Sequence, residues 1–146
     1  MKKVTILAMF NTMASTVIAP MDTFYQAGVI WNYFRGQRPT PLFETEIVTL
    51  DGKPFKCLNG TVISPDHSIH SVDATDLIVV SSILNIEKTL KYQGEALVWL
   101  KHHYAQGTHI ASICTGAFVL AETGLLDGKT ATTHWGAADE FRQRYP

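Results

Sequence analysis

Three short apolar runs constrain the fold of this chain more than any other feature. They span residues 4–10, 76–80 and 109–113 and consist mostly of Val, Ile, Leu, Ala and Met. A strand with one solvated face alternates apolar and polar residues, whereas a strand of a parallel sheet is covered on both faces and lacks that alternation. The runs therefore predict strands of a mostly parallel sheet, with those at 4–10 and 76–80 buried.

Segments with helical periodicity lie between these strands. Residues from about 15 to 34 predict one helix with Pro20 in its first turn, and residues from about 86 to 106 predict another, ended by Gly107. Further elements are expected as strands at 43–50 and 130–132, a hairpin at 54–63, and helices at 115–122 and 137–145. Because strands and helices alternate, the chain is expected to have an α/β fold.

Length, charge and cysteine content exclude several classes of protein. With 146 residues, of which 46% are hydrophobic, the chain has the size of one domain and contains no linker or repeat. Its net charge of -1 comes from scattered residues, so binding to nucleic acid by this chain alone is not expected. The first apolar run is too short to span a membrane, and Cys57 and Cys114 do not form a disulfide framework. These features predict a cytoplasmic protein without membrane association.

Cys114 occupies the corner where run 109–113 meets the next helix. Ser112 stands two residues before it and Gly116 two residues after it. Small residues at these positions are typical of a nucleophile elbow, a sharp turn that lifts the central side chain above the end of its strand. The free N–H groups at the start of the helix would favour a thiolate. A small buried residue at a tight corner fits the same spacing.

Two longer motifs resemble a known family. Ser112 to Gly128 and Ala131 to Trp135, together with Ala19 to Phe24 in the first helix, resemble the PfpI superfamily of class I glutamine-amidotransferase-like domains. Within it, the sequence is most similar to sensor domains of AraC-family transcriptional regulators, and isocyanide hydratase is a near relation. The resemblance covers nearly the whole chain and implies a flavodoxin-like three-layer sandwich, usually dimeric. It places Cys114 on the nucleophile and His134 on the histidine near it.

The resemblance also assigns residues around the thiol. An oxyanion would be held by the N–H of Thr115 and by an N–H of Ser81–Ser82, where many relatives have two glycines. The acidic partner of active relatives is replaced by Thr16, whose hydroxyl is neither an acid nor a base at neutral pH. Asp22 matches a later carboxylate and is expected to cap, pair or face a dimer seam. Trp135 is a candidate wall of a small-molecule pocket.

The resemblance implies the N-terminal ligand-sensing and dimerisation domain of an AraC-family regulator, with an intact elbow and a degraded catalytic set. The expected partners are an unidentified small-molecule effector and a second copy of the chain. Two alternatives stay open: a cysteine-dependent hydratase or amidase, and a redox sensor in which the Cys114 thiol is the signal. Residues 1–146 are expected to form one incomplete PfpI-like domain, with a DNA-binding helix-turn-helix domain beyond Pro146. No cofactor is expected, and no metal, because His67 and His70 lack further ligands at suitable spacing.

Overall fold

A parallel five-stranded sheet forms the centre of the protein. The computed structural model describes residues 1–146. The strand order is β5-β2-β1-β6-β7, and every neighbouring pair is parallel. The strands of this sheet are β1 (Lys2–Leu7), β2 (Phe43–Thr49), β5 (His67–Ser68), β6 (Leu77–Val80) and β7 (His109–Ser112). The predicted hairpin is confirmed as the antiparallel pair β3 (Phe55–Lys56) and β4 (Val62–Ile63).

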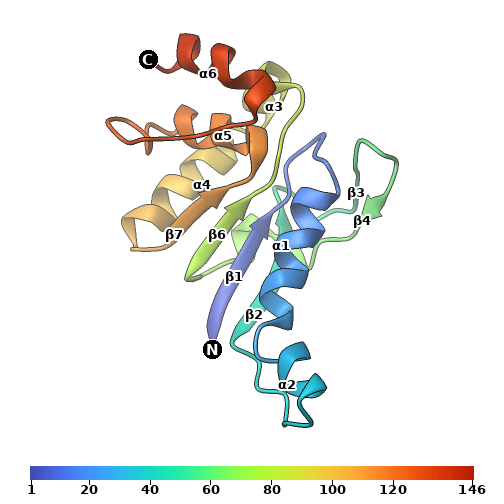
Figure 1. Ribbon diagram of the computed structural model, residues 1–146. Coiled ribbons are helices and arrows are strands. Elements are labelled where there is room, and N and C mark those ends of the chain that lie inside the picture. The colour runs from blue at the N-terminus through green and yellow to red at the C-terminus, as the bar shows by residue number, and fades with distance from the viewer.

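Helices cover the sheet on both sides (Figure 1). One side carries α1 (Ser15–Gln26) and α2 (Ile30–Phe34), with the hairpin beside them; the other carries α3 (Ile86–Tyr92), α4 (Gly94–Ala105), α5 (Ala117–Glu122) and α6 (Ala138–Arg144). Three 3₁₀ turns complete the chain: η1 (Ile69–Ser71), η2 (Cys114–Gly116) and η3 (Trp135–Ala137). A core of 14 buried residues lies on the α3–α6 side and one of 8 on the α1 side. The expected three-layer α/β sandwich is therefore confirmed.

Strand β1 marks the point where the sheet changes its direction of winding. The chain passes from β1 to β2 on one side and later to β6 on the other. In open α/β sheets, the connections that leave such neighbouring strands diverge, and ligands bind in the crevice between them at the carboxyl ends. This end of the sheet carries residues 8–13 after β1, residues 81–83 after β6 and Cys114 after β7.

The single helix predicted over residues 15–34 is wrong. Helix α1 ends at Gln26, and Gly28 adopts a φ of +76° before α2 begins. A Cβ at Gly28 would lie 2.1 Å from the carbonyl oxygen of Thr40, so the break depends on a later loop that packs against it. Pro20 is the sixth residue of α1 and not part of its first turn.

Two further elements differ from the prediction. The helix expected over residues 86–106 is divided into α3 and α4 at Gln93, whose φ and ψ are -119° and 27°. The apolar stripe continues through both helices, so periodicity does not reveal the break. The strand expected at 130–132 is wrong because these residues are exposed and irregular, and β7 remains at the edge of the sheet. No helix combines the length and apolar character needed to span a bilayer.

Candidate functional site

The chain turns sharply at Cys114. Ile113 is still extended, with φ -111° and ψ 131°, whereas Cys114 has a φ of +58°. Left-handed backbone is uncommon for residues other than glycine, and Asn11 is the only other example in this chain. The N–H of Gly116 donates to the carbonyl of Ile113 at 2.9 Å and closes the turn. The strand-to-helix elbow expected from the sequence is therefore present at Cys114.

The elbow is packed tightly against the loop that follows β6. A Cβ at Gly116 would lie 2.6 Å from the Ser81 carbonyl oxygen and 2.8 Å from that of Val80. The Thr115 hydroxyl accepts a hydrogen bond from the Ile83 N–H at 3.0 Å and donates to the Ile83 carbonyl. Glycine at 116 and threonine at 115 thus hold the turn in contact with residues 80–83.

Of the backbone N–H groups expected to hold an oxyanion, only that of Thr115 is available. The Thr115 N–H has no acceptor within the protein. The three N–H groups of the facing loop are all used: Ser81 donates to Leu7 O at 3.1 Å, Ser82 to Thr16 Oγ1 at 3.1 Å, and Ile83 to the Thr115 hydroxyl. An oxyanion hole aligns two donors on the developing charge, and this arrangement provides one.

A cluster of buried hydroxyl groups lies at the crevice between β1 and β6. Thr16 Oγ1 is 3.0 Å from Ser82 Oγ and 3.1 Å from Thr12 Oγ1, and all three residues are buried. Thr12 was not among the residues expected at the site, although its position just after β1 was a usable signal. Asp22, six residues beyond Thr16, is exposed on α1 and takes no part in the cluster. The three hydroxyl groups of the cluster therefore carry no charge at neutral pH.

The segment that follows α5 contacts the elbow through Thr133, whose hydroxyl donates to the Cys114 carbonyl at 3.2 Å. His134 is exposed, and its Nδ1 accepts a hydrogen bond from the Gly136 N–H at 3.1 Å, which caps η3. No hydrogen bond joins His134 to the thiol. Trp135 is 85% exposed, with its ring centroid 5.5 Å from that of His134, so it does not wall an enclosed pocket in this structure.

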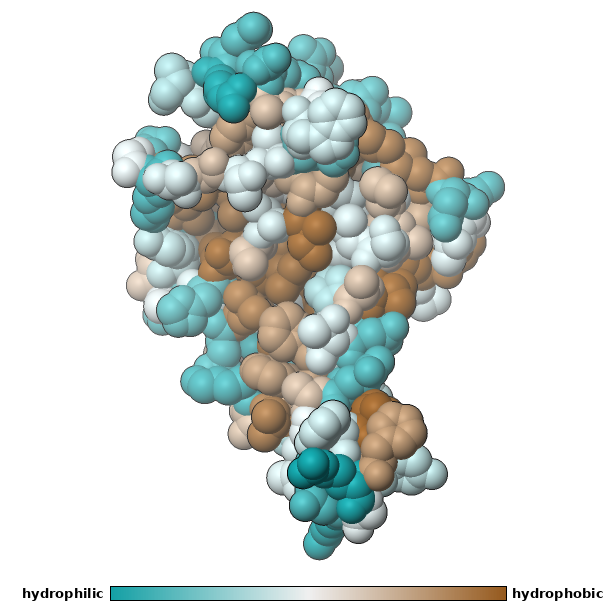
Figure 2. Space-filling model, in the orientation of Figure 1, coloured by the Kyte–Doolittle hydropathy of each residue, from teal (hydrophilic) through white to brown (hydrophobic).

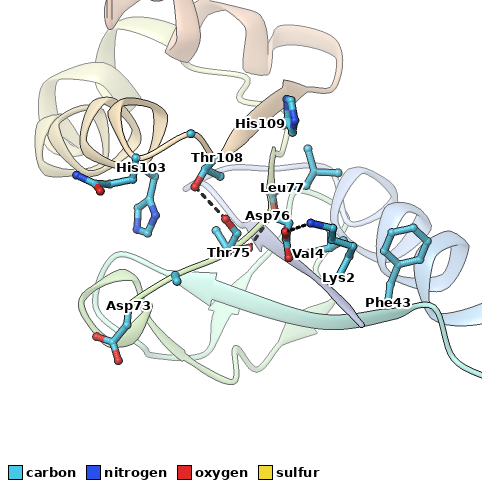
Figure 3. A pocket seen from close by; sticks show the side chains of 13 residues that line it. Lys2, Val4, Phe43, Asp73, Thr75, Asp76, Leu77, His103, Thr108 and His109 are labelled. Atoms are coloured by element: carbon cyan, nitrogen blue, oxygen red, sulfur yellow. Dashed lines mark hydrogen bonds and ion pairs between the residues drawn. The ribbon is translucent and has the colours of Figure 1, made fainter.

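A cavity of about 710 Å³, whose lining is drawn in Figure 3, lies among the starts of β1, β2, β6 and β7, at the opposite end of the sheet from the elbow. Its polar groups join the start of β1 to the residue before β6. Lys2 Nζ is 2.5 Å from Asp76 Oδ1, and the Lys3 N–H donates to Asp76 Oδ2 at 2.8 Å. The hydrogen bond from Lys2 holds the pKa of Asp76 below its ordinary value. Thr108 Oγ1 donates to Thr75 O at 2.9 Å. Because these groups already pair with one another, the elbow end remains the candidate site.

Comparison with known proteins agrees with this geometry. The model of the DJ-1/PfpI family matches residues 2–145. The chain belongs to the DJ-1/PfpI family. The HTH-type transcriptional regulator CdhR of Pseudomonas aeruginosa is 33% identical over 105 residues, which cover 72% of this chain and 31% of that protein. The isonitrile hydratase of Pseudomonas putida is 29% identical over 99 residues, or 68% of this chain and 43% of that enzyme.

The fold of this DJ-1/PfpI chain also matches solved structures. The crystal structure of an AraC family transcriptional regulator from Pseudomonas putida superposes with a TM-score of 0.80 at 21% identity, over 100% of this chain and 74% of that one. The chain spans less than a third of the length of CdhR, the curated relative described above.

Cys57, the other thiol of this DJ-1/PfpI domain, is buried in the smaller core, and this burial raises the pKa of the thiol. No group of three or more His, Cys, Asp or Glu side chains is arranged to hold a metal ion.

Proposed function

We propose that this DJ-1/PfpI domain senses a small-molecule effector for an AraC-family transcriptional regulator and binds it without turnover. The observation that carries the proposal is the hydrogen bond from the Ser82 N–H to Thr16 Oγ1, at 3.1 Å. It occupies the second N–H that an oxyanion would need, and it places a neutral hydroxyl where a cysteine enzyme needs an acid or base. The elbow is therefore built for contact with a ligand rather than for its chemical conversion.

The hydroxyl cluster also provides a way to transmit binding. It joins the loop after β1, through Thr12, to the start of α1, through Thr16, and to the loop after β6, through Ser82. A ligand that replaces one of these neutral hydrogen bonds changes how α1 is held on the sheet. Differential contact of this kind is what couples a ligand to a conformational change.

We infer that α1 and α2 form a homodimer surface. Both helices expose apolar side chains. Figure 2 shows brown, hydrophobic residues around α2, at the lower end of the molecule. Exposed apolar patches of this kind mark protein interfaces. The exposed apolar residues are Ile18 and Tyr25 on α1 and Ile30, Trp31, Tyr33 and Phe34 on α2. A dimer would place two DNA-binding units on paired half-sites.

The regulator assignment implies that further parts of the protein complete the domain and bind DNA. Strand β7 is at the edge of the sheet, and His109 and Ala111 are exposed on it. Native proteins pair or cover such edges. We infer that the full-length protein covers β7 and contains a helix-turn-helix domain, to which all sequence-specific DNA binding belongs.

Mobility-shift titration tests the regulator function. The full-length gene product is expected to bind paired half-sites near its own promoter, with affinity that falls about 1,000-fold or more between about 50 and 200 mM salt. Residues 1–146 should not bind that DNA, because their net charge is -1 and their basic residues are scattered. Tight operator binding by residues 1–146, or a full-length product without a helix-turn-helix domain, would reject the assignment.

A cysteine-dependent hydratase is the second candidate, favoured by the elbow geometry of Cys114 and by the unoccupied N–H of Thr115. We expect the wild-type protein to convert isonitriles, amides and glutamine no faster than a Cys114→Ser control does. Chromatographic detection of the N-substituted formamide formed by adding water to an isonitrile measures the first reaction. Wild-type turnover that disappears in Cys114→Ser would transfer the assignment to the hydratase.

A further inference from the structure

We propose that a second small-molecule site lies above the carboxyl ends of β1 and β2, beside the β3–β4 hairpin. A cavity of about 330 Å³ opens there, within the range of small ligand pockets. Its walls come from residues 8–10, 49–51 and 53–55 and from Gln93 at the break between α3 and α4. Cys114 and His134 do not line it, so the site is separate from the elbow.

Thr49 indicates that this cavity takes a ligand with a hydrogen-bonding group. The residue lines the cavity and is only 5% exposed, and its Oγ1 has no hydrogen-bond partner within the protein. A buried hydroxyl without a partner is costly, and native proteins rarely retain one. A χ1 rotation that turns the hydroxyl toward the cavity would give it a partner in an occupant of the cavity.

The other walls define the chemical class of the occupant. Met9, Leu50 and Phe55 make much of the lining apolar. The only charged residues of the lining are Asp51 and Lys53, and both are exposed. Lys53 Nζ lies 3.6 Å from Asp51 Oδ2, so each charge already has a partner and neither is free to pair with a charged ligand. Thr49 is thus the only buried residue of the lining with a polar side chain, and its hydroxyl is neutral. The site fits a small, uncharged molecule with an apolar body and one hydroxyl, carbonyl or amide group.

The cavity is connected to the elbow crevice by residues 9–13. Phe10 lines the cavity, and its N–H donates to Gln93 Oε1 at 3.5 Å. Two residues later, Thr12 joins the hydroxyl cluster, and the Met13 N–H donates to Ser82 Oγ at 3.2 Å. An occupant that moves Phe10 therefore acts on the same segment that holds the crevice. This effector role rests on the proposed sensing function, whereas the binding itself does not.

Nuclear magnetic resonance with two matched probes tests the site. Cyclohexanol has the apolar body and one hydroxyl, and methylcyclohexane has the same shape without it. Cyclohexanol is expected to shift the amide signals of Phe10, Asp51 and Phe55 and to bind about fivefold more tightly than methylcyclohexane, the value of one neutral hydrogen bond. Thr49→Val keeps the shape of the side chain and should abolish this preference.

Thr89→Val is the matched control. The Thr89 hydroxyl is also buried without a partner, but Thr89 belongs to α3 and does not line the cavity. Both substitutions remove an unsatisfied hydroxyl, so neither should lower Tm. Only Thr49→Val should change the preference between the probes, which separates ligand contact from a general effect on packing.

Three results would overturn the proposal. The first is that neither probe shifts the signals of these amides. The second is that the preference for cyclohexanol survives in Thr49→Val or is lost equally in Thr89→Val. The third is that cyclohexylammonium or cyclohexanecarboxylate binds more tightly than cyclohexanol. The assay contains no DNA. A protein that binds its operator but not cyclohexanol would keep the regulator function and reject this site. A protein that binds cyclohexanol but no operator would keep this site and reject the regulator function.

Discussion

Gly116→Ala should destabilise the protein by about 3 kcal/mol, which is large against the stability of a typical domain. The added Cβ would lie 2.6 Å from Ser81 O and 2.8 Å from Val80 O, and both are backbone atoms that cannot rotate away. Gly116 has φ -57° and ψ -20°, values that alanine adopts readily, so the expected loss comes from the contact and not from backbone strain. Urea unfolding measures the free-energy difference.

Gly94→Ala provides the control for Gly116→Ala. Gly94 is the first residue of α4, and nothing lies within 4 Å of the position that a Cβ would occupy. Alanine is favoured over glycine in helices by about 0.5–1 kcal/mol, so this variant should be as stable as the wild type or more stable. If Gly116→Ala behaves in the same way, the elbow does not pack against the loop after β6 as described.

Phe118→Ala should cost about 3–5 kcal/mol, the usual range for a buried phenylalanine. Phe118 is fully buried in α5, and its ring meets Phe141 edge-on at 4.9 Å and Tyr145 at 6.1 Å. Its loss would therefore loosen α6 as well as create a cavity. Urea unfolding again measures the change, and Val98→Ala, at an α4 side chain that is 69% exposed and outside the proposed dimer surface, should change stability by less than about 0.5 kcal/mol.

Tyr145 provides a second readout for the same variant. Burial, followed by the hydrogen bond to Glu122, raises the pKa of Tyr145 to about 12. A raised pKa means that the fold favours the protonated phenol, so loosening α6 should move this ionisation to lower pH. Ultraviolet titration of Phe118→Ala should show the phenolate of Tyr145 forming earlier than in the wild type. An unchanged titration together with wild-type stability would contradict the packing described for α6.

Local sequence was sufficient to predict the main strands and the elbow. A strand covered on both faces requires a continuous apolar run, and the runs at 4–10 and 76–80 became the buried strands β1 and β6. Run 109–113 became β7, which lies at the edge with His109 and Ala111 exposed. The corner at Cys114 was predictable because its steric requirement falls on Ser112 and Gly116, two residues away on either side. Both signals lie within a few residues of the feature that they predict.

Features that depend on distant contacts were not predictable in this way. The break at Gly28 is packed against the Thr40 loop, which leaves no room for a Cβ, and the break at Gln93 interrupts an apolar stripe that continues on both sides. The strand expected at 130–132 had suitable residues but does not pair with β7. The unpartnered hydroxyl of Thr49 also has no local signature, since threonine is an ordinary strand residue.

The sequence by itself determined the α/β class, the family and the positions of the thiol and of Thr16. Only the tertiary structure decided what those residues do together. Thr16 and Ser82 are 66 positions apart, and they meet because β1 and β6 are neighbours in the sheet. Whether the Ser82 N–H is free for an oxyanion or donated to Thr16 depends on the distance and angle between two loops. Residue identity constrains such geometry weakly, because a hydroxyl can donate, accept or rotate to another partner.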